Sequence, residues 1–327
     1  MIVLIEYSFF RSDPRDRMLS VFASFKSLFQ LKKCLIDNTT FRMHYQWTFA
    51  ILCVCSLLQT LTQFFGKPID CMVEGVSKSV FDTYCWIHGT FTLPSQLTGR
   101  RGVDFPHPGV GPYPHSSTNT EDSNLVEVTA DGDEIRHAWY QWVIFVLFLQ
   151  ALCCYLPHYL WKVWEGKKIS LLVQDLDCPT LDTVKEKTEE KRRVIVNYFY
   201  KNNRTHNLYV SKFVFCEFLN LVNILGQMYL MDLFFSGSFL DYGFNIMSST
   251  SGDNLEKEIA QVFPKIGKCT INTYGVSGTI QTDDSFCVLP LNNFNGKFYF
   301  FLWFWYLLVL SWTSIFFCFR IITIASR

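Results

Sequence analysis

The sequence predicts an all-α membrane protein built as a four-transmembrane-helix bundle, because four long apolar segments recur along its 327 residues. Residues 43–66, 138–161 and 298–319 contain no Asp, Glu, Lys or Arg, and residues 213–235 contain only Glu217 and Asp232. About 20 apolar residues cross the hydrocarbon core of a bilayer. Charged residues make up 18% of the chain, below the roughly 25% typical of soluble domains. Four such segments favour membrane spans over buried helices of a soluble core.

These segments define nine stretches of chain. We expect a cytosolic N-terminal segment (1–46), transmembrane segment 1 (47–65), extracellular loop 1 (66–138), transmembrane segment 2 (139–160), a cytosolic loop (161–212), transmembrane segment 3 (213–235), extracellular loop 2 (236–297), transmembrane segment 4 (298–319) and a short cytosolic tail (320–327).

Basic residues predict this orientation. The three stretches assigned to the cytosol hold 20 Lys and Arg in 106 residues, whereas the two long loops hold 9 in 135. Basic residues close to a membrane resist translocation, so both termini are expected in the cytosol of a multi-pass plasma-membrane protein. The glycosylation sequons that begin at Asn38 and Asn203 both fall on the cytosolic side, and the outer loops contain none.

Four of the twelve cysteines lie in the predicted outer loops: Cys71 and Cys85 in the first, Cys269 and Cys287 in the second. An extracellular compartment allows disulfides, whereas the other eight cysteines lie where free thiols are favoured. Four cysteines permit three pairings, and the sequence alone does not separate them. Bridges within each loop are the simplest arrangement. Bridges between the loops would join spans 1 and 2 to spans 3 and 4.

Polar residues in the outer half of span 1 share one helical face: Ser56, Gln59, Thr60 and Gln63. They are candidates for lining a water-filled pore, with hydrogen bonding between helices as the equally weighted alternative.

Span 3 carries a second polar set, Glu217, Asn220, Asn223 and Gln227, within an arc of roughly 120° on a 3.6-residue helix. A carboxylate within a membrane segment is a candidate functional group, but Glu217 is close enough to the cytosolic end to have a structural role instead. In span 2, Pro157 removes one backbone donor and predicts a helix kink.

Motifs of catalysis and cofactor binding are absent from the sequence. It contains no phosphate-binding glycine loop, no HExxH pair and no nucleophile elbow, and its seven histidines form no metal-binding pair with a cysteine. We therefore expect no enzyme, no catalytic residue, no metal, no cofactor and no nucleic-acid partner.

Six local strings resemble the innexins, the invertebrate gap-junction proteins related to pannexins. They are GKPIDC (66–71), YCWIHGTFTLP (84–94), WYQWV (139–143), LPHYLWKVWEGKKI (156–169), NILGQMYLMDLFF (223–235) and CVLPLNNFNGKFYFFLWFW (287–305). The 13 residues between the first two loop cysteines and the 17 between the last two also match this family.

The resemblance implies a ring of subunits, eight in the family, around an aqueous pore, and docking of two rings from apposed cells through their outer loops. It implies the disulfides Cys71–Cys287 and Cys85–Cys269, and an N-terminal segment that lines the cytosolic pore mouth. The expected function is a subunit of a large-pore gap-junction channel for ions and small metabolites, surrounded by membrane lipid and able to combine with other innexins. An undocked hemichannel and a non-conducting subunit that modifies other innexins are the alternatives.

Three features depart from the family pattern. Trp139 stands where a Tyr is usual, and residues 1–17 resemble an extension upstream of the usual start near Met18. The predicted tail of about eight residues resembles short-tailed insect innexins and those carried by some insect viruses.

Overall fold

A computed structural model describes residues 37–73, 77–97, 102–103, 105–111, 134–168, 189–190, 192–194, 196–197, 200, 207–248 and 252–326. The predicted pore-mouth segment and the choice between Met1 and Met18 lie outside these residues. The chain divides into two compact units. The first comprises residues 1–52, 150–223 and 309–327, and the second comprises residues 53–149 and 224–308.

Four helical stretches are long and apolar enough to cross a membrane: Thr39–Phe65, Trp139–Glu165, Asn207–Phe234 and Pro290–Ala325. The predicted fold class, four membrane helices with two loops joined by cysteine pairs, is therefore confirmed. The helices extend past the charge-free windows because helix ends depend on capping and backbone hydrogen bonding as well as on hydrophobicity. Proline at the first position of the last helix suits such an end, since no N–H is needed there.

The first of these stretches is built from three pieces, α3 (Thr39–Arg42), the π-helical segment η1 (Met43–Thr48) and α4 (Phe49–Phe65). The side chain of Asn38 caps α3 by accepting the N–H of Phe41 at 3.0 Å. In η1, His44 is fully buried and its Nε2 lies 3.0 Å from the hydroxyl of Thr313. A π-helical turn directs this polar ring toward another helix within the first unit.

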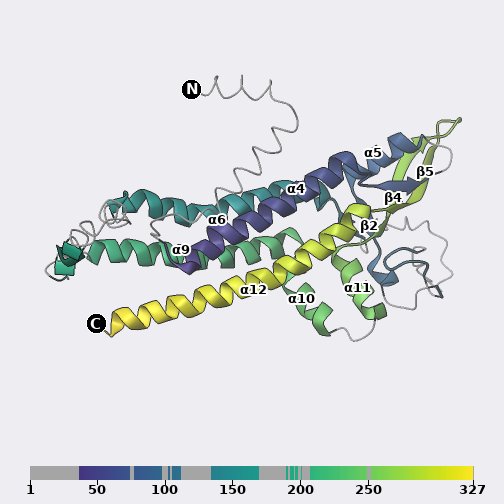
Figure 1. The fold of residues 1–327 in the computed structure, drawn as a ribbon. Coiled ribbons are helices and arrows are strands. Elements are labelled where there is room, and N and C mark those ends of the chain that lie inside the picture. Colours follow the sequence, from purple (N-terminus) through teal and green to yellow (C-terminus); the bar gives the residue numbers. More distant parts are fainter. Residues whose placement is uncertain are drawn as a thin grey trace, which may run out of the picture. The chain divides into compact units, whose positions relative to one another are not determined.

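The other three stretches follow in order. A 3₁₀ turn, η3 (Trp139–Trp142), leads into α6 (Val143–Glu165), and the remaining two are α9 (Asn207–Phe234) and α12 (Pro290–Ala325). Figure 1 shows α12 as the longest ribbon, ending at the C-terminus. Helix α6 continues through Pro157, where the sequence predicts a kink.

Within the second unit, segments from both loops form a five-stranded antiparallel sheet with the order β1–β5–β4–β2–β3. The strands are β1 (Asp70–Met72), β2 (Thr90–Thr92), β3 (Ile135–His137), β4 (Ile266–Tyr274) and β5 (Ile280–Val288). This sheet is not among the elements expected from the sequence. Three of its strands are three residues long, too short for an alternating pattern to indicate a strand.

The second loop supplies the centre of the sheet, a hairpin of β4 and β5 whose nine residue pairs run from Ile266↔Val288 to Tyr274↔Ile280 (Figure 1). Strands β1 and β2 from the first loop pair with opposite edges of this hairpin. The sheet is thus assembled from chain segments separated by about 200 residues, and neither loop could form it alone.

Three helices accompany the sheet in the second unit: α5 (Lys78–His88), α10 (Phe239–Ser248) and α11 (Gly252–Val262). A short 3₁₀ turn, η2 (Pro94–Gln96), follows β2. Helix α5 buries Phe81 and Cys85 in a cluster with Tyr140 and the sheet residues Cys269 and Cys287. This cluster is the core between α5 and the sheet.

His137 is a buried histidine in β3, and its Nε2 lies 2.9 Å from the hydroxyl of Thr92 on the neighbouring strand. Burial lowers the pKa of His137 from 6.5 to about 4. As the pH falls through this interval, the unfolded chain takes up a proton that the folded sheet does not. Stability that is present above about pH 6.5 is therefore lost toward pH 4.

We predict that His137→Gln reduces the acid sensitivity of folding. Glutamine can keep a hydrogen bond to Thr92 but cannot be protonated. Because the pKa is lowered, protonating His137 in the native protein costs on the order of 3 kcal/mol more than in the unfolded chain. Thermal unfolding of the purified protein at about pH 7 and about pH 4.5 measures this effect. The difference in midpoint between the two pH values should be smaller in the variant; an equal difference would contradict the assignment.

Candidate functional site

Two disulfides join the first loop to the second. Cys71 on β1 is bonded to Cys287 on β5, and Cys85 on α5 is bonded to Cys269 on β4. These are the pairs that the family resemblance implies. Cys71 and Cys287 are direct cross-strand partners, so the sheet register itself places them together. The remaining cysteines within the described residues form no disulfide.

The sulfurs of Cys71, Cys85 and Cys287 lie within 4.8 Å of one another. Such a group resembles a metal-binding cluster, but metal binding by cysteine requires the thiolate. All three sulfurs are already bonded in disulfides. The cluster is therefore explained as two adjacent disulfides in the core of the sheet.

Polar contacts align α5 with β1 beside these bridges. The N–H of Cys71 donates to Oδ1 of Asp82 at 2.9 Å, and Lys78 lies 2.5 Å from Asp70. The Lys78 ammonium group lowers the pKa of Asp70. Both members of this pair are about half exposed, so water screens it and it adds little stability.

The polar face of α4 is in part a helix contact. Ser56 is buried and donates to the carbonyl of Ile144 on α6 at 3.3 Å. Gln59 is also buried, and its Nε2 donates to Oδ1 of Asn295 on α12. Within one protomer neither side chain is open to solvent, and both make hydrogen bonds between helices, the arrangement given above as the alternative to pore lining.

Gln59 begins a chain of buried amides. Asn295 Nδ2 donates to Oδ1 of Asn292 at 3.2 Å, and Asn292 Nδ2 donates to the carbonyl of Pro264 at 2.8 Å. This chain links α4 through α12 to the residues that precede β4, so these three amide side chains are hydrogen-bonded and the sheet is positioned at the same time.

Thr60 and Gln63 are half-buried. The hydroxyl of Thr60 donates to the carbonyl of Ser56 one turn earlier, at 2.8 Å. Oε1 of Gln63 has no hydrogen-bond partner within the described part of the chain. A buried acceptor left unpaired costs about 1–3 kcal/mol, so water or a neighbouring subunit is expected to supply the missing donor.

Glu217 on α9 is the centre of a charged network in the first unit. Arg320 on α12 binds it with both arms, Nε to Oε2 at 3.1 Å and Nη2 to Oε1 at 3.2 Å. Asn38 Nδ2 donates to the same carboxylate at 2.5 Å while its Oδ1 caps α3. The guanidinium of Arg320 also lies 5.4 Å from the ring centre of Phe213. Glu217 thus holds the start of the first membrane helix to two others.

The other polar residues of α9 are fully or partly buried, and one of them contacts a second helix. Asn220 and Gln227 are buried, and Asn223 Nδ2 lies 3.6 Å from the sulfur of Cys154 on α6. Glu217 is likewise buried within one protomer, and a pore role for this set stays a prediction. The sequence identified Glu217 and Gln59 but not their partners, because spacing along one helix does not identify the helix that faces it. These partners are Asn38 and Arg320 for Glu217, and Asn295 for Gln59.

Four long apolar helices and two loops joined by disulfides define a multi-pass membrane protein. Comparison with known proteins gives its family: the chain belongs to the innexins, whose family model matches residues 37–327. Innexins are four-span subunits of oligomeric gap-junction channels, not enzymes.

Curated relatives agree along nearly the whole chain. The chain is 44% identical to Innexin inx2 of Schistocerca americana over 309 residues, 94% of this chain and 81% of that protein. It is 43% identical to Innexin inx2 of Drosophila melanogaster over 311 residues, covering 94% and 80%. Innexin shaking-B of Drosophila melanogaster is 36% identical over 315 residues, again covering 94% and 80%.

We predict an energetic coupling between Glu217 and Arg320. Glu217→Gln leaves the Arg320 guanidinium without its counter-charge and should lower the free energy of unfolding by about 2 kcal/mol. This loss is smaller than that expected for a fully buried ion pair, because the Arg320 side chain is 40% exposed. The double variant Glu217→Gln/Arg320→Gln should lose less than the sum of the single variants. Thermal unfolding in detergent measures all three, and strictly additive losses would show that the pair is not coupled.

Proposed function

We propose that this chain is a pore-forming subunit of a large-pore gap-junction channel that passes ions and small metabolites between adjacent cells. The observation that carries the proposal is the disulfide-bonded sheet, which joins both loops into one structure outside the membrane helices. A surface that meets a partner across an intercellular gap must keep its shape without support from the membrane. Two covalent links between the loops provide that rigidity.

Assembly as a ring of eight subunits that docks to a ring on the apposed cell is part of this proposal, and the same ring could include other innexins. The tip of the β4–β5 hairpin exposes the apolar side chains of Tyr274, Val276 and Ile280. Exposed apolar side chains on a hairpin suit contact with another protein. The absence of sequons from the predicted outer loops also favours docking, because attached glycans would obstruct it.

The proposed orientation places the sheet outside the cell and both termini in the cytosol, supported by the excess of Lys and Arg in the predicted cytosolic stretches. An epitope tag at the C-terminus should be reached by antibody only after permeabilisation.

For the pore wall, we propose Thr60 and Gln63 as the remaining candidates on α4. We predict that Gln63→Cys reacts with a charged, water-soluble thiol reagent and that conductance then falls several-fold, since the pore supplies water to this face. Ser56→Cys is the matched control, because Ser56 is buried against α6 and should not react. Equal protection of both positions would remove Gln63 from the pore wall.

Two alternatives make different use of the same fold. An undocked hemichannel would release metabolites from single cells, and a non-conducting subunit would act only by modifying other innexins. The exposed hairpin tip favours the docked channel over both.

Electrophysiology on paired cells that express this chain alone distinguishes these functions. We predict a junctional current between such pairs. In Cys71→Ser this current should fall at least tenfold, because the change breaks one link between the loops. Cys318→Ser is the control, since Cys318 is a free, exposed cysteine, and it should conduct normally. Current across single-cell membranes without coupling would favour the hemichannel; no current despite surface expression would favour the modifying subunit.

A further inference from the structure

Helix α10 presents three different faces around its axis. At about 100° per residue, each face covers roughly 60 to 100°. The buried face consists of Phe239, Tyr242 and Gly243, the exposed apolar face of Leu240, Phe244 and Met247, and the polar face of Asp241, Asn245 and Ser248. On the apolar face, Leu240 is 39% exposed, Phe244 60% and Met247 61%. If water surrounded the whole exposed surface of α10, its exposed apolar and polar side chains would not be expected to lie on two separate faces.

The buried face fixes α10 directly against α12. A Cβ atom on Gly243 would lie 2.2 Å from the ring of Trp303, so only glycine permits this approach. Trp303 Nε1 donates to the carbonyl of Leu240 at 3.2 Å, and the Tyr242 hydroxyl donates to the carbonyl of Gly296 at 3.1 Å. The position of α10 along α12 is therefore set by hydrogen bonds and by close packing.

This position is at the edge of the apolar part of α12. Trp303 is five residues inside the charge-free segment 298–319, about 7.5 Å along the helix axis. The ring of Phe244 meets the Trp303 ring edge-on at 4.8 Å between centroids. Helix α10 also begins five residues after α9 ends at Phe234. Interfacial helices bury their apolar face about 5–10 Å into the boundary between headgroups and acyl chains. The depth of Trp303 within the charge-free segment, about 7.5 Å, lies in this range.

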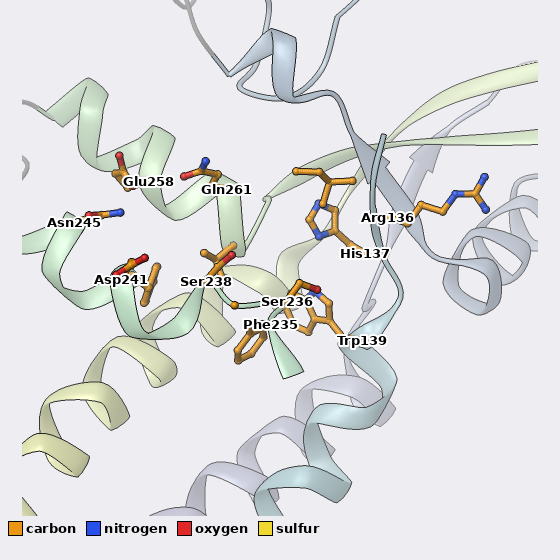
Figure 2. A pocket seen from close by; sticks show the side chains of 14 residues that line it. Arg136, His137, Trp139, Phe235, Ser236, Ser238, Asp241, Asn245, Glu258 and Gln261 are labelled. Carbon is orange, nitrogen blue, oxygen red and sulfur yellow. The ribbon is translucent and has the colours of Figure 1, made fainter. Parts of the chain in front are cut away.

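The polar face of α10 has a separate, polar environment. Asp241 and Asn245 line a cavity of about 400 Å³, together with Glu258 and Gln261 of α11. Figure 2 shows these four side chains on one side of the cavity, and His137 and Trp139 on the other. Polar groups of α10 are thus directed to a cavity with polar lining, away from the apolar face formed by Leu240, Phe244 and Met247.

We propose that α10 is an interfacial membrane helix whose apolar face is inserted among the acyl chains of the leaflet on the sheet side of the bilayer. It anchors the disulfide-bonded sheet to the membrane surface, beside the helices that cross it. The inference depends on insertion of the chain into a membrane and not on channel activity, so it can fail while the proposed function holds.

Photocrosslinking tests this directly. The full-length protein, carrying p-benzoylphenylalanine in place of Phe244 or, separately, of Met247, is reconstituted in nanodiscs of palmitoyl-oleoyl phosphatidylcholine and irradiated. The matched control carries the same group in place of Asn245, on the polar face of the same helix. We expect adducts with the mass of one phospholipid at positions 244 and 247, at least fivefold more abundant than at position 245.

Every other outcome overturns the proposal. A covalent dimer of the chain would show that a neighbouring subunit covers the face. Absence of adducts, or equal adducts at all three positions, would show that the face has no preference for lipid. A second comparison needs no crosslinker: Met247→Asp places a charge on the apolar face and should lower the thermal midpoint in nanodiscs, whereas Asn245→Asp adds the same charge on the polar face and should leave it unchanged. Equal midpoints for the two variants would contradict the anchor.

Discussion

The covalent connection of the two loops is the constraint on which the second unit depends. Cys71–Cys287 and Cys85–Cys269 join residues 216 and 184 positions apart, and both bridges lie in one sheet core. Closing loops of this length is entropically costly, and a bridge removes that cost from the unfolded chain, by several kcal/mol in the chain-entropy model. The same unit contains part of each membrane helix, namely residues 53–65, 139–149, 224–234 and 290–308. One sheet therefore belongs to the same compact unit as parts of all four membrane helices.

Inside the helices, the governing constraint is the satisfaction of polar groups. Burying a polar side chain in a low-dielectric surrounding costs free energy unless it is hydrogen-bonded, and burying a carboxylate costs more unless it is also paired. Gln59 meets this requirement through Asn295, and Glu217 through Arg320 and Asn38. In each case the hydrogen bond that offsets the free-energy cost of burying the polar group also fixes one helix against another. Polar residues thus specify the arrangement of helices that apolar packing alone would leave less defined.

The two constraints meet in the amide chain from Gln59 to the carbonyl of Pro264, two residues before β4 begins. Through it, a residue within the first membrane helix is connected to the strand that carries Cys269. The adjacent helix α10 is held to α12 by Gly243 and Trp303, so the sheet and its accessory helices are fixed to the membrane helices at more than one point. Such multiple fixing suits the proposed role of the sheet as a docking surface outside the bilayer.

The sequence by itself determined the four membrane helices, since 20 or more largely apolar residues with few or no charges can be stable in few other ways, and its local strings determined the innexin family. It also located the polar residues on α4 and α9, because helical spacing shows which side chains share a face. Only the tertiary structure decided that Ser56 and Gln59 face other helices, that Glu217 pairs with Arg320, and that both loops build one sheet. These features join residues far apart in the chain, and periodicity within one segment carries no information about which distant segment lies opposite it.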